Sequence, residues 1–357
     1  MKVNIMTNLK ILSIDGGGTR GVIPATILHR IFEETGKHPV DLYDLMAGTS
    51  TGGILCTGYA YGISTREMLK LYLEKSAEIF HDSGWDDLRD GFGKNIGADY
   101  SNKKFKSILK NIFEDNTLQD IRERNSNGKA RLMVCSFDLN PEEVNTKVSA
   151  KSRPMNFRPR IFHSDFMRDQ DVSLTDLCLM TSAGPTYFPI YKDHIDGGVS
   201  LNNPAMAALA YAINKRKDGV KEYRHPDGKM KGLGKELKDV KIFSLGCGTS
   251  NHNYISSSEI KKKKNGDWGN LQWVKYLPDM LTETNMQASD YYVNQLLGKD
   301  QYKRIQLYFD LPEAPGLIRG KTVGLDVKRK DLLKAMIQYA NEVFDREKDQ
   351  IFEFLEI

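Results

Sequence analysis

The sequence predicts an α/β fold with a parallel sheet covered by helices on both faces, and two strand–turn units near the N-terminus carry this prediction. Residues 11–14 form a short apolar run that ends in Asp-Gly-Gly-Gly, as expected for a buried strand followed by a tight turn. Residues 42–47 form a second apolar run, which a glycine- and threonine-rich segment at 48–53 closes. Because a helical pattern follows each turn, we expect the strands to run parallel and to be buried on both faces.

The first helix is predicted by the spacing of its apolar residues. Ile23, Ile27 and Ile31 recur at helical intervals, and Gly36 stands where such a helix would end. Other short apolar runs have the composition of buried strands. They lie at residues 132–137, 240–245 and 302–307. From residue 326 onward, apolar residues at helical spacing predict a helical tail packed on the sheet.

Composition excludes several classes of protein. The chain has 357 residues, 40% hydrophobic and 27% charged, which is unlike a disordered, collagenous or disulfide-stapled chain. No apolar run approaches the ~20 residues that a membrane span needs. With 51 basic against 47 acidic residues, we expect no nucleic-acid polymer as a partner. The N-terminus lacks the apolar core of a secretory signal and the four cysteines stand singly, so we expect reduced thiols and a cytoplasmic location.

Three polar segments interrupt the alternation of strands and helices. Residues 80–102 are rich in glycine and aspartate and carry Phe80, Trp85 and Phe92, which fits either a surface loop or a lid over a site. Two lysine-rich segments are interpreted as solvated insertions. They lie at residues 214–239 and 261–264.

Ser50 is the first candidate for chemistry. It lies at the centre of Gly48-Thr49-Ser50-Thr51-Gly52, between an apolar strand and a segment that can begin a helix. Glycines two residues before and after the serine permit a strained corner that lifts the hydroxyl out of the sheet. The helix that follows directs free N–H groups at the same point, which favours developing negative charge. The strand–turn–helix context therefore indicates a nucleophilic serine rather than an ordinary turn residue.

The glycine-rich loop at residues 15–21 allows three interpretations. It matches the G-x-G-x-x-G pattern of a dinucleotide-binding loop, but the next strand ends in Ala47-Gly48 with no carboxylate to hold a ribose. The second interpretation is an oxyanion hole, in which glycine N–H groups face a substrate carbonyl without a Cβ to obstruct it. The third is a plain turn with no ligand.

A serine nucleophile requires a base. Among the seven histidines, His225 and His252 lie in polar segments, and His194 precedes Asp196 by two residues on the same face of an expected strand. Asp196 itself is followed by Gly197 and Gly198, so its carboxylate would stand at a strand end where catalytic groups are delivered. A carboxylate can act directly as the base, and the alternative for Asp196 is a turn or helix-cap role.

Metal and phosphate-loop patterns give no candidate. The chain has no H-E-x-x-H segment, no paired cysteines, no EF-hand spacing and no G-x-x-x-x-G-K-[ST] loop. We therefore expect neither a metal nor a cofactor.

Taken together and in this order, the three motifs resemble those of the patatin-like phospholipases. Segments 181–189, 202–204 and 244–249 also resemble segments of this family, and the likeness covers roughly residues 8–310. Gly184 stands where the family usually has alanine. The resemblance implies a three-layer α/β/α sandwich around a mostly parallel sheet, with residues 1–310 as the catalytic domain and residues 311–357 as a helical extension packed on it.

The resemblance also implies roles for individual residues. Ser50 and Asp196 would form a catalytic dyad that needs no metal. The oxyanion loop would comprise Gly16, Gly17, Gly18, Thr19, Arg20 and Gly21. Gly48 and Gly52 would shape the nucleophile elbow, and Gly197 and Gly198 the turn after the base. Arg20 would brace its loop or meet a lipid phosphate.

The activity implied by the resemblance is hydrolysis of fatty-acyl esters of membrane lipids, of the phospholipase A or lysophospholipase type, at the inner membrane surface. Phe80, Trp85 and Phe92 would then form an interfacial lid. The chain is also similar to bacterial antiphage effectors of this family that cyclic nucleotides switch on. Alternatives are an acyltransferase with the same dyad and a non-catalytic binding or storage relative. The sequence predicts no oligomeric state.

Overall fold

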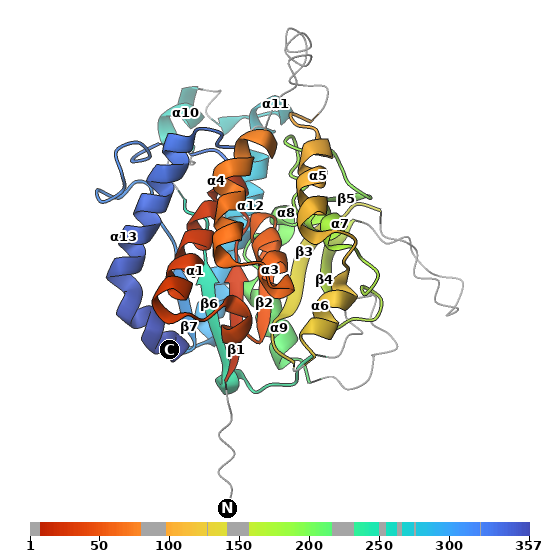
Figure 1. The fold of residues 1–357 in the computed structure, drawn as a ribbon. Coiled ribbons are helices and arrows are strands. Elements are labelled where there is room, and N and C mark those ends of the chain that lie inside the picture. Colours follow the sequence, from red (N-terminus) through yellow and green to blue (C-terminus); the bar gives the residue numbers. More distant parts are fainter. Residues whose placement is uncertain are drawn as a thin grey trace, which may run out of the picture.

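One seven-stranded sheet organises the chain, as seen in a computed structural model (Figure 1). The structure describes residues 8–79, 98–126, 128–140, 157–215, 232–249, 255–262, 266–274, 276–321 and 323–357. The strands are β1 (Leu9–Ile14), β2 (Leu45–Thr49), β3 (Arg131–Asp138), β4 (Arg158–His163), β5 (His194–Asp196), β6 (Val240–Leu245) and β7 (Tyr302–Ile305). Their order is β4-β3-β2-β1-β6-β7, with β5 also paired to β3. Only β4 and β5 run antiparallel to their neighbour, so the sheet is mostly parallel.

Helices cover both faces of the sheet, which confirms the α/β/α prediction. The larger helices are α1 (Val22–Thr35), α3 (Thr51–Tyr61), α4 (Thr65–Ile79), α5 (Asn102–Phe113), α9 (Ala205–Ile213), α12 (Leu277–Leu296) and α13 (Lys330–Leu355). The shorter ones are α2 (Pro39–Leu42), α6 (Leu118–Arg124), α7 (Leu174–Thr181), α8 (Gly198–Leu201), α10 (Ser257–Lys262) and α11 (Asn270–Trp273), together with 3-10 turns at Gly18–Gly21 and Leu237–Asp239.

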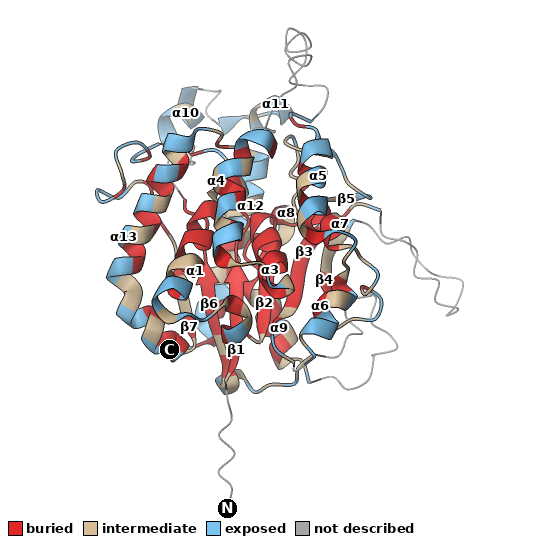
Figure 2. Cartoon of the chain, viewed as in Figure 1, coloured by how far each residue is buried: buried red, intermediate tan, exposed pale blue. Residues whose placement is uncertain are grey.

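Side chains alternate along β1 between two apolar cores. Leu12 and Ile14 pack with residues of α1, α3 and α13, whereas Leu9 and Ile11 pack with residues of α9 and α12. All four side chains are buried, because each face of the strand meets a helical layer. Figure 2 shows the same pattern for the whole molecule, with buried strands at the centre and the exposed faces of helices outside.

Two expected strands differ from the structure. Residues 39–42 form α2 because Pro39 occupies its first turn and Asp41 accepts a hydrogen bond from the His38 backbone N–H, so β2 begins only at Leu45. The last strand ends at Ile305 rather than at residue 307. Residues 80–97 and 216–231, which include most of the expected lid and of the first lysine-rich insertion, lie outside the described residues.

The predicted helical tail is present as α13, which packs along α1 (Figure 1). The Arg30 guanidinium meets the Asp345 carboxylate at 2.7 Å, and Lys10 Nζ donates to the Leu355 carbonyl at 2.6 Å. The apolar face of α13 completes the core over α1 and β6. Nowhere in the described segments is there a helix both long and apolar enough to cross a membrane.

The end of α1 provides a stability test. Gly36 follows the helix with φ +69° in the left-handed region, and an added Cβ would meet nothing within 4 Å. Gly36→Ala should therefore lower the free energy of unfolding by about 1 kcal/mol through backbone strain alone. Urea denaturation measures this change. Gly316→Ala, also free of contacts but without a positive φ, is the control, and an equal loss in both variants would contradict the backbone explanation.

Candidate active site

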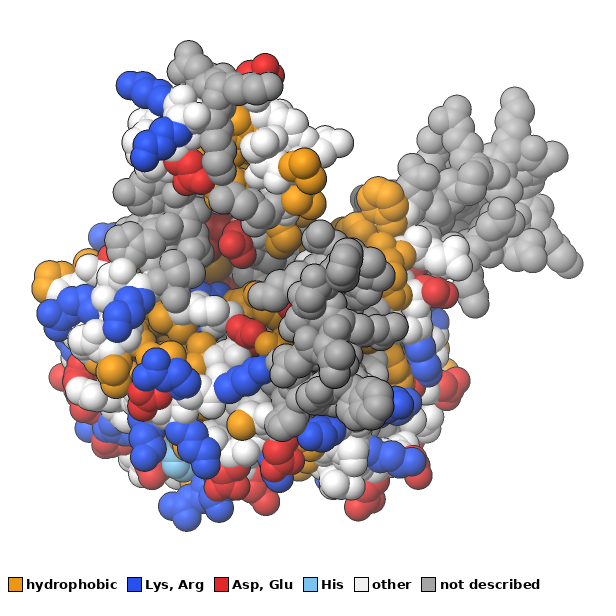
Figure 3. Space-filling view, turned by 90° about the horizontal axis from the view of Figure 1, so that it is seen from above, with side chains coloured by type: hydrophobic (Ala, Val, Ile, Leu, Met, Phe, Trp, Pro, Cys, Tyr) orange, Lys and Arg blue, Asp and Glu red, His pale blue; other side chains and the backbone are white. Residues whose placement is uncertain are grey.

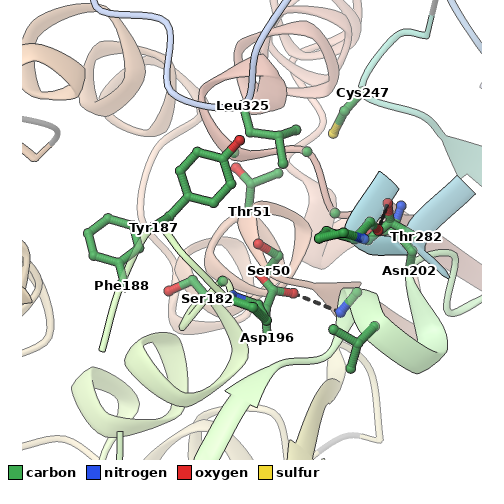
Figure 4. A pocket seen from close by; sticks show the side chains of 18 of the residues that line it. Ser50, Thr51, Ser182, Tyr187, Phe188, Asp196, Asn202, Cys247, Thr282 and Leu325 are labelled. Atoms are coloured by element: carbon green, nitrogen blue, oxygen red, sulfur yellow. Dashed lines mark hydrogen bonds between the residues drawn. The ribbon is translucent and has the colours of Figure 1, made fainter. Parts of the chain in front are cut away.

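Three loops meet at the carboxyl ends of β1, β2 and β5 and line one pocket of about 790 Å³. They contribute Gly17 and Gly18, then Ser50, then Asp196. The carboxyl ends of the parallel strands β1 and β2 share one edge of the sheet. The antiparallel β5 pairs with the last residues of β3, which brings Asp196 to the same edge. Figure 4 shows Ser50 and Asp196 side by side in the pocket. The three segments that the sequence singled out are thus brought together by the fold.

Ser50 occupies a strained corner between β2 and α3. Its φ of +53° lies in the positive-φ half of the Ramachandran map, which residues with a side chain rarely adopt, so the surrounding structure must enforce it. An added Cβ at Gly48 would lie 2.2 Å from the Gly52 carbonyl oxygen, which leaves room only for glycine. The Ser50 backbone N–H donates to Thr181 Oγ1 at 2.8 Å, which fixes the corner to α7. This is the strand–turn–helix geometry that a nucleophile elbow needs.

Asp196 is held where its carboxylate meets the serine. The Gly198 N–H donates to Asp196 Oδ1 at 2.7 Å. Burial raises the pKa of Asp196 to about 6, although hydrogen bonds from the Ser50 hydroxyl and the Gly198 N–H oppose the shift. Such a carboxylate is ionised at neutral pH yet more basic than an exposed aspartate, which suits a general base.

His194 does not compete for this role. Its Nδ1 lies 2.6 Å from the Lys192 carbonyl oxygen, its ring packs against Phe162, and it does not line the pocket. The two other histidines considered, His225 and His252, lie outside the described residues. Asp196 is therefore the candidate base that the described structure places beside Ser50.

The glycine-rich loop after β1 presents two free backbone donors. The Gly16 N–H donates to the Asn202 carbonyl at 3.0 Å, and the Thr19 N–H to the Leu325 carbonyl at 2.7 Å. The N–H groups of Gly17 and Gly18 make no hydrogen bond within the described part of the chain. Both residues line the pocket, so these two N–H groups can bind an oxyanion.

Arg20 lines the pocket from the same loop. Its Nε donates to the Gly17 carbonyl at 3.4 Å, which agrees with a bracing role. Its guanidinium forms no ion pair with a described carboxylate, although Asp279 and Glu283 act on it at longer range. A positive group in this position is available to a ligand anion.

Asp15 and Arg304 form a buried ion pair under the oxyanion loop, which the sequence reasoning did not find. Arg304 Nη2 lies 2.5 Å from Asp15 Oδ2, and its Nη1 lies 2.7 Å from Ser244 Oγ. Asp15 is fully buried, and burial raises its pKa although Arg304 opposes the shift. The pair ties the end of β1 to β6 and β7. Only the fold brings these residues together, since 289 positions separate them.

The rest of the pocket wall is mostly apolar. Leu71, Ile79, Phe105 and Phe188 line one part, and α12 supplies Leu277, Leu281 and Met286. Leu325, from the chain before α13, covers the oxyanion loop through its backbone bond to Thr19. A pocket of this size and lining suits an acyl chain. Among the residues that the structure describes, no cluster of three or more His, Cys, Asp or Glu residues is arranged to hold a metal ion.

The chain is similar in sequence to known proteins of one family. A sequence model of the patatin-like phospholipases matches residues 12–209. The chain is 28% identical to patatin-like protein 2 of Oryza sativa over 89% of its own length and 80% of the relative. It is 30% identical to a cGAMP-activated phospholipase of Vibrio cholerae over 74% of this chain and 72% of that protein. The crystal structure of VipD from Legionella pneumophila aligns with 95% of this chain and 67% of the VipD chain, at 13% sequence identity and a TM-score of 0.40.

The mostly parallel α/β/α fold and the matched relatives identify a lipid acyl hydrolase as the class of protein. The chain belongs to the patatin-like phospholipase family, since the family match spans more than half of its residues.

The buried ion pair predicts a coupled loss of stability and activity. Arg304→Met leaves the Asp15 carboxylate buried without a partner and should lower the free energy of unfolding by about 3–5 kcal/mol. In the double variant Asp15→Asn/Arg304→Met the charge is gone, so much of this stability should return. Ester hydrolysis should remain impaired because the end of β1 loses its tie to β7. Denaturation and kinetics on all variants test this, and strictly additive losses would contradict the coupling.

Proposed function

We propose that the protein is a lipid acyl hydrolase of the phospholipase A or lysophospholipase type, acting through Ser50 and Asp196. The observation that carries the proposal is the placement of Ser50 beside the buried Asp196 carboxylate at the end of a largely apolar pocket (Figure 4). The N–H groups of Gly17 and Gly18, which make no hydrogen bond with a described residue, lie in the same pocket. A serine with a base and an oxyanion hole is the arrangement that acyl transfer requires.

The reaction begins when Ser50 Oγ attacks the ester carbonyl and its proton passes to Asp196. The resulting oxyanion accepts hydrogen bonds from the N–H groups of Gly17 and Gly18, each worth roughly 2.7–4 kcal/mol of transition-state stabilisation. As the tetrahedral intermediate collapses, the C–O bond to the alcohol breaks and Asp196 returns the proton to the leaving oxygen. Water then attacks the acyl-enzyme, Asp196 takes its proton, and Ser50 recovers that proton when the fatty acid leaves.

Other residues of the pocket define the substrate in this proposal. The apolar wall takes the acyl chain, and Arg20 meets the phosphate of a phospholipid headgroup while it braces its loop. We place residues 1–310 as the catalytic domain, and residues 311–357 as an extension that supports the oxyanion loop through Leu325. The site acts at the surface of the inner membrane, from the cytoplasmic side.

Activation by a cyclic nucleotide is a second, finer part of the proposal. A relative that is 30% identical over 74% of this chain is a cGAMP-activated phospholipase, and the lysine-rich segments of this chain can bind an anionic activator. Such control would suit a role in antiphage defence, in which the enzyme degrades membrane lipid only after a signal activates it.

Hydrolysis by dyad variants tests the catalytic proposal. Wild type should release fatty acid from mixed phospholipid vesicles and cleave a p-nitrophenyl ester, with or without a panel of cyclic di- and trinucleotides. Ser50→Ala and Asp196→Asn should each lose at least 10³-fold in kcat. Asp196→Asn should be at least as stable as wild type at pH 7, because it removes a carboxylate whose ionisation is disfavoured by burial.

Several outcomes would contradict the proposal. Retained activity in Ser50→Ala would exclude the dyad. An inactive wild type under every nucleotide would favour a binding or storage role. Acyl transfer to an added alcohol or lysophospholipid, in preference to water, would identify an acyltransferase.

The pH dependence of hydrolysis reports the base. Asp196 must be ionised to accept the serine proton, and its pKa is raised to about 6. The value of kcat/KM should therefore fall about tenfold per pH unit below about 6 and level off above it. The measurement is a soluble-ester assay between pH 4.5 and 8.5, with the fold monitored by circular dichroism at each pH. A midpoint near 4, as for an exposed aspartate, would contradict the buried-base assignment.

A further inference from the structure

Large apolar side chains stand exposed on the stretch of chain that leads into α12. Leu271 is 86% exposed, Val274 is 60% exposed and Leu281 is 49% exposed. Soluble proteins rarely leave several such residues together on one surface unless that surface meets a partner or a membrane. We name the exposed set on α11 and the first turns of α12 the apolar ridge. It comprises Leu271, Trp273, Val274, Leu277, Met280 and Leu281.

The apolar ridge and the pocket share residues. Val274, Leu277 and Leu281 are exposed and also line the pocket. Phe157, which is 66% exposed, lines the pocket from a different part of the chain. Figure 3 looks onto this end of the molecule and shows hydrophobic side chains in separate clusters across the face. An acyl chain that moves from an apolar phase above this face into the pocket would contact these apolar side chains on its way.

Aromatic residues at the base of the apolar ridge are of the kind that prefer a membrane interface. The Trp268 ring lies 5.2 Å from that of Trp273 and stacks on Tyr276 at 5.6 Å, between ring centroids. The Tyr276 hydroxyl is hydrogen-bonded to Glu259, which ties this cluster to α10. Two of the three tryptophans of the chain are therefore found here. Their amphipathic rings favour the headgroup region of a bilayer.

Charges near the apolar ridge fit a phospholipid surface. Lys261 and Lys262 end α10 and are both exposed, next in the fold to the aromatic cluster. Asp279 and Glu283 of α12 line the pocket, where they act on Arg20, and Asp267 is an exposed acidic residue of this region. With both signs present, the surface suits zwitterionic lipid and gains moderately from anionic headgroups.

The helix that carries the apolar ridge is fixed to the catalytic turn. Asn285 Oδ1 accepts from the Asn202 N–H at 2.6 Å, and Asn285 Nδ2 donates to the Gly198 carbonyl at 2.8 Å. Gly198 lies two residues after the proposed base. A bilayer that contacts the outer face of α12 would therefore lie at a fixed position relative to Asp196.

We propose that the apolar ridge is the surface by which this protein docks onto a phospholipid bilayer, so that an acyl chain enters the pocket directly from the membrane. The choice of a bilayer over a second protein rests on the shared residues with the pocket, the interfacial aromatics and the flanking lysines. The substrate that enters depends on the lipid hydrolase function proposed above. Docking itself requires no catalysis.

Vesicle binding by matched pairs of variants tests docking. Leu271→Glu/Met280→Glu changes two residues of the apolar ridge that do not line the pocket, and Tyr291→Glu/Leu296→Glu is a control on exposed residues farther along α12. Both pairs are made in the full chain with Ser50→Ala, which keeps the lipid intact. On phosphatidylcholine vesicles with and without phosphatidylglycerol, the ridge pair should lower the partition coefficient at least tenfold and the control pair less than twofold.

Activity measurements separate docking from catalysis. With Ser50 restored, the ridge pair should lose at least tenfold on vesicles and less than twofold on a soluble ester. Unchanged vesicle binding, or an equal loss in the control pair, would overturn the proposal. If wild type binds vesicles through the ridge but cleaves no ester, docking stands and the proposed function fails.

A second copy of the chain is the competing occupant. Sedimentation without lipid measures it, and a dimer that the ridge pair abolishes while vesicle binding persists would overturn docking. The milder pair Leu271→Ser/Met280→Ser, checked by circular dichroism, serves if the glutamates disturb the fold, and it should lower vesicle binding at least threefold.

Discussion

The close backbone contact between the turn after β2 and the end of β1 is the constraint on which the site depends. An added Cβ at Gly52 would lie 2.1 Å from the Ile14 carbonyl oxygen and 2.8 Å from that of Asp15. The two turns therefore pack backbone against backbone, with no side chain between them. This contact sets the separation between the Ser50 hydroxyl and the free N–H groups of Gly17 and Gly18. A larger residue at Gly52 would push the proposed nucleophile away from the proposed oxyanion hole.

Burial raises the pKa of both carboxylates of the site, but the two differ in their partners. Asp15 is paired with Arg304 and hydrogen-bonded on the inner side of its loop, so its charge serves to anchor the strand ends. Asp196 forms no ion pair with a described cation, and burial raises its pKa to about 6 although hydrogen bonds from the Gly198 N–H and the Ser50 hydroxyl oppose the shift. Its ionisation destabilises the folded state as the pH rises from about 4 to about 6. The fold thus buries both carboxylates, and the described structure gives a cationic partner only to Asp15.

The two glycine-rich turns of the candidate site could be predicted because their glycines and the apolar run before each of them form a local sequence pattern. The turns at residues 15–18 and 48–52 require a positive φ or a close backbone approach that glycine permits, and a buried strand precedes each of them. Contacts between residues far apart in the sequence leave no local pattern. The sequence therefore assigned no role to Arg304, Thr181 or Leu325, although each fixes a loop of the candidate site. The strand at residues 158–163 was missed because Arg158, Pro159 and Arg160 give it no apolar alternation. Which of the six oxyanion-loop residues keeps a free N–H depends on contacts with Asn202 and Leu325, and only the fold supplies them.

A single carboxylate acting as base links the chemistry of the proposed site to its surroundings. No histidine among the described residues lines the pocket, so Asp196 must be basic enough to take the serine proton, and exclusion of water raises its basicity. The pocket wall that excludes water is partly made by Leu277 and Leu281, which are exposed at the surface. A bilayer seated on these residues would remove further water from the pocket. Substrate delivery and strengthening of the base would then follow from the same contact.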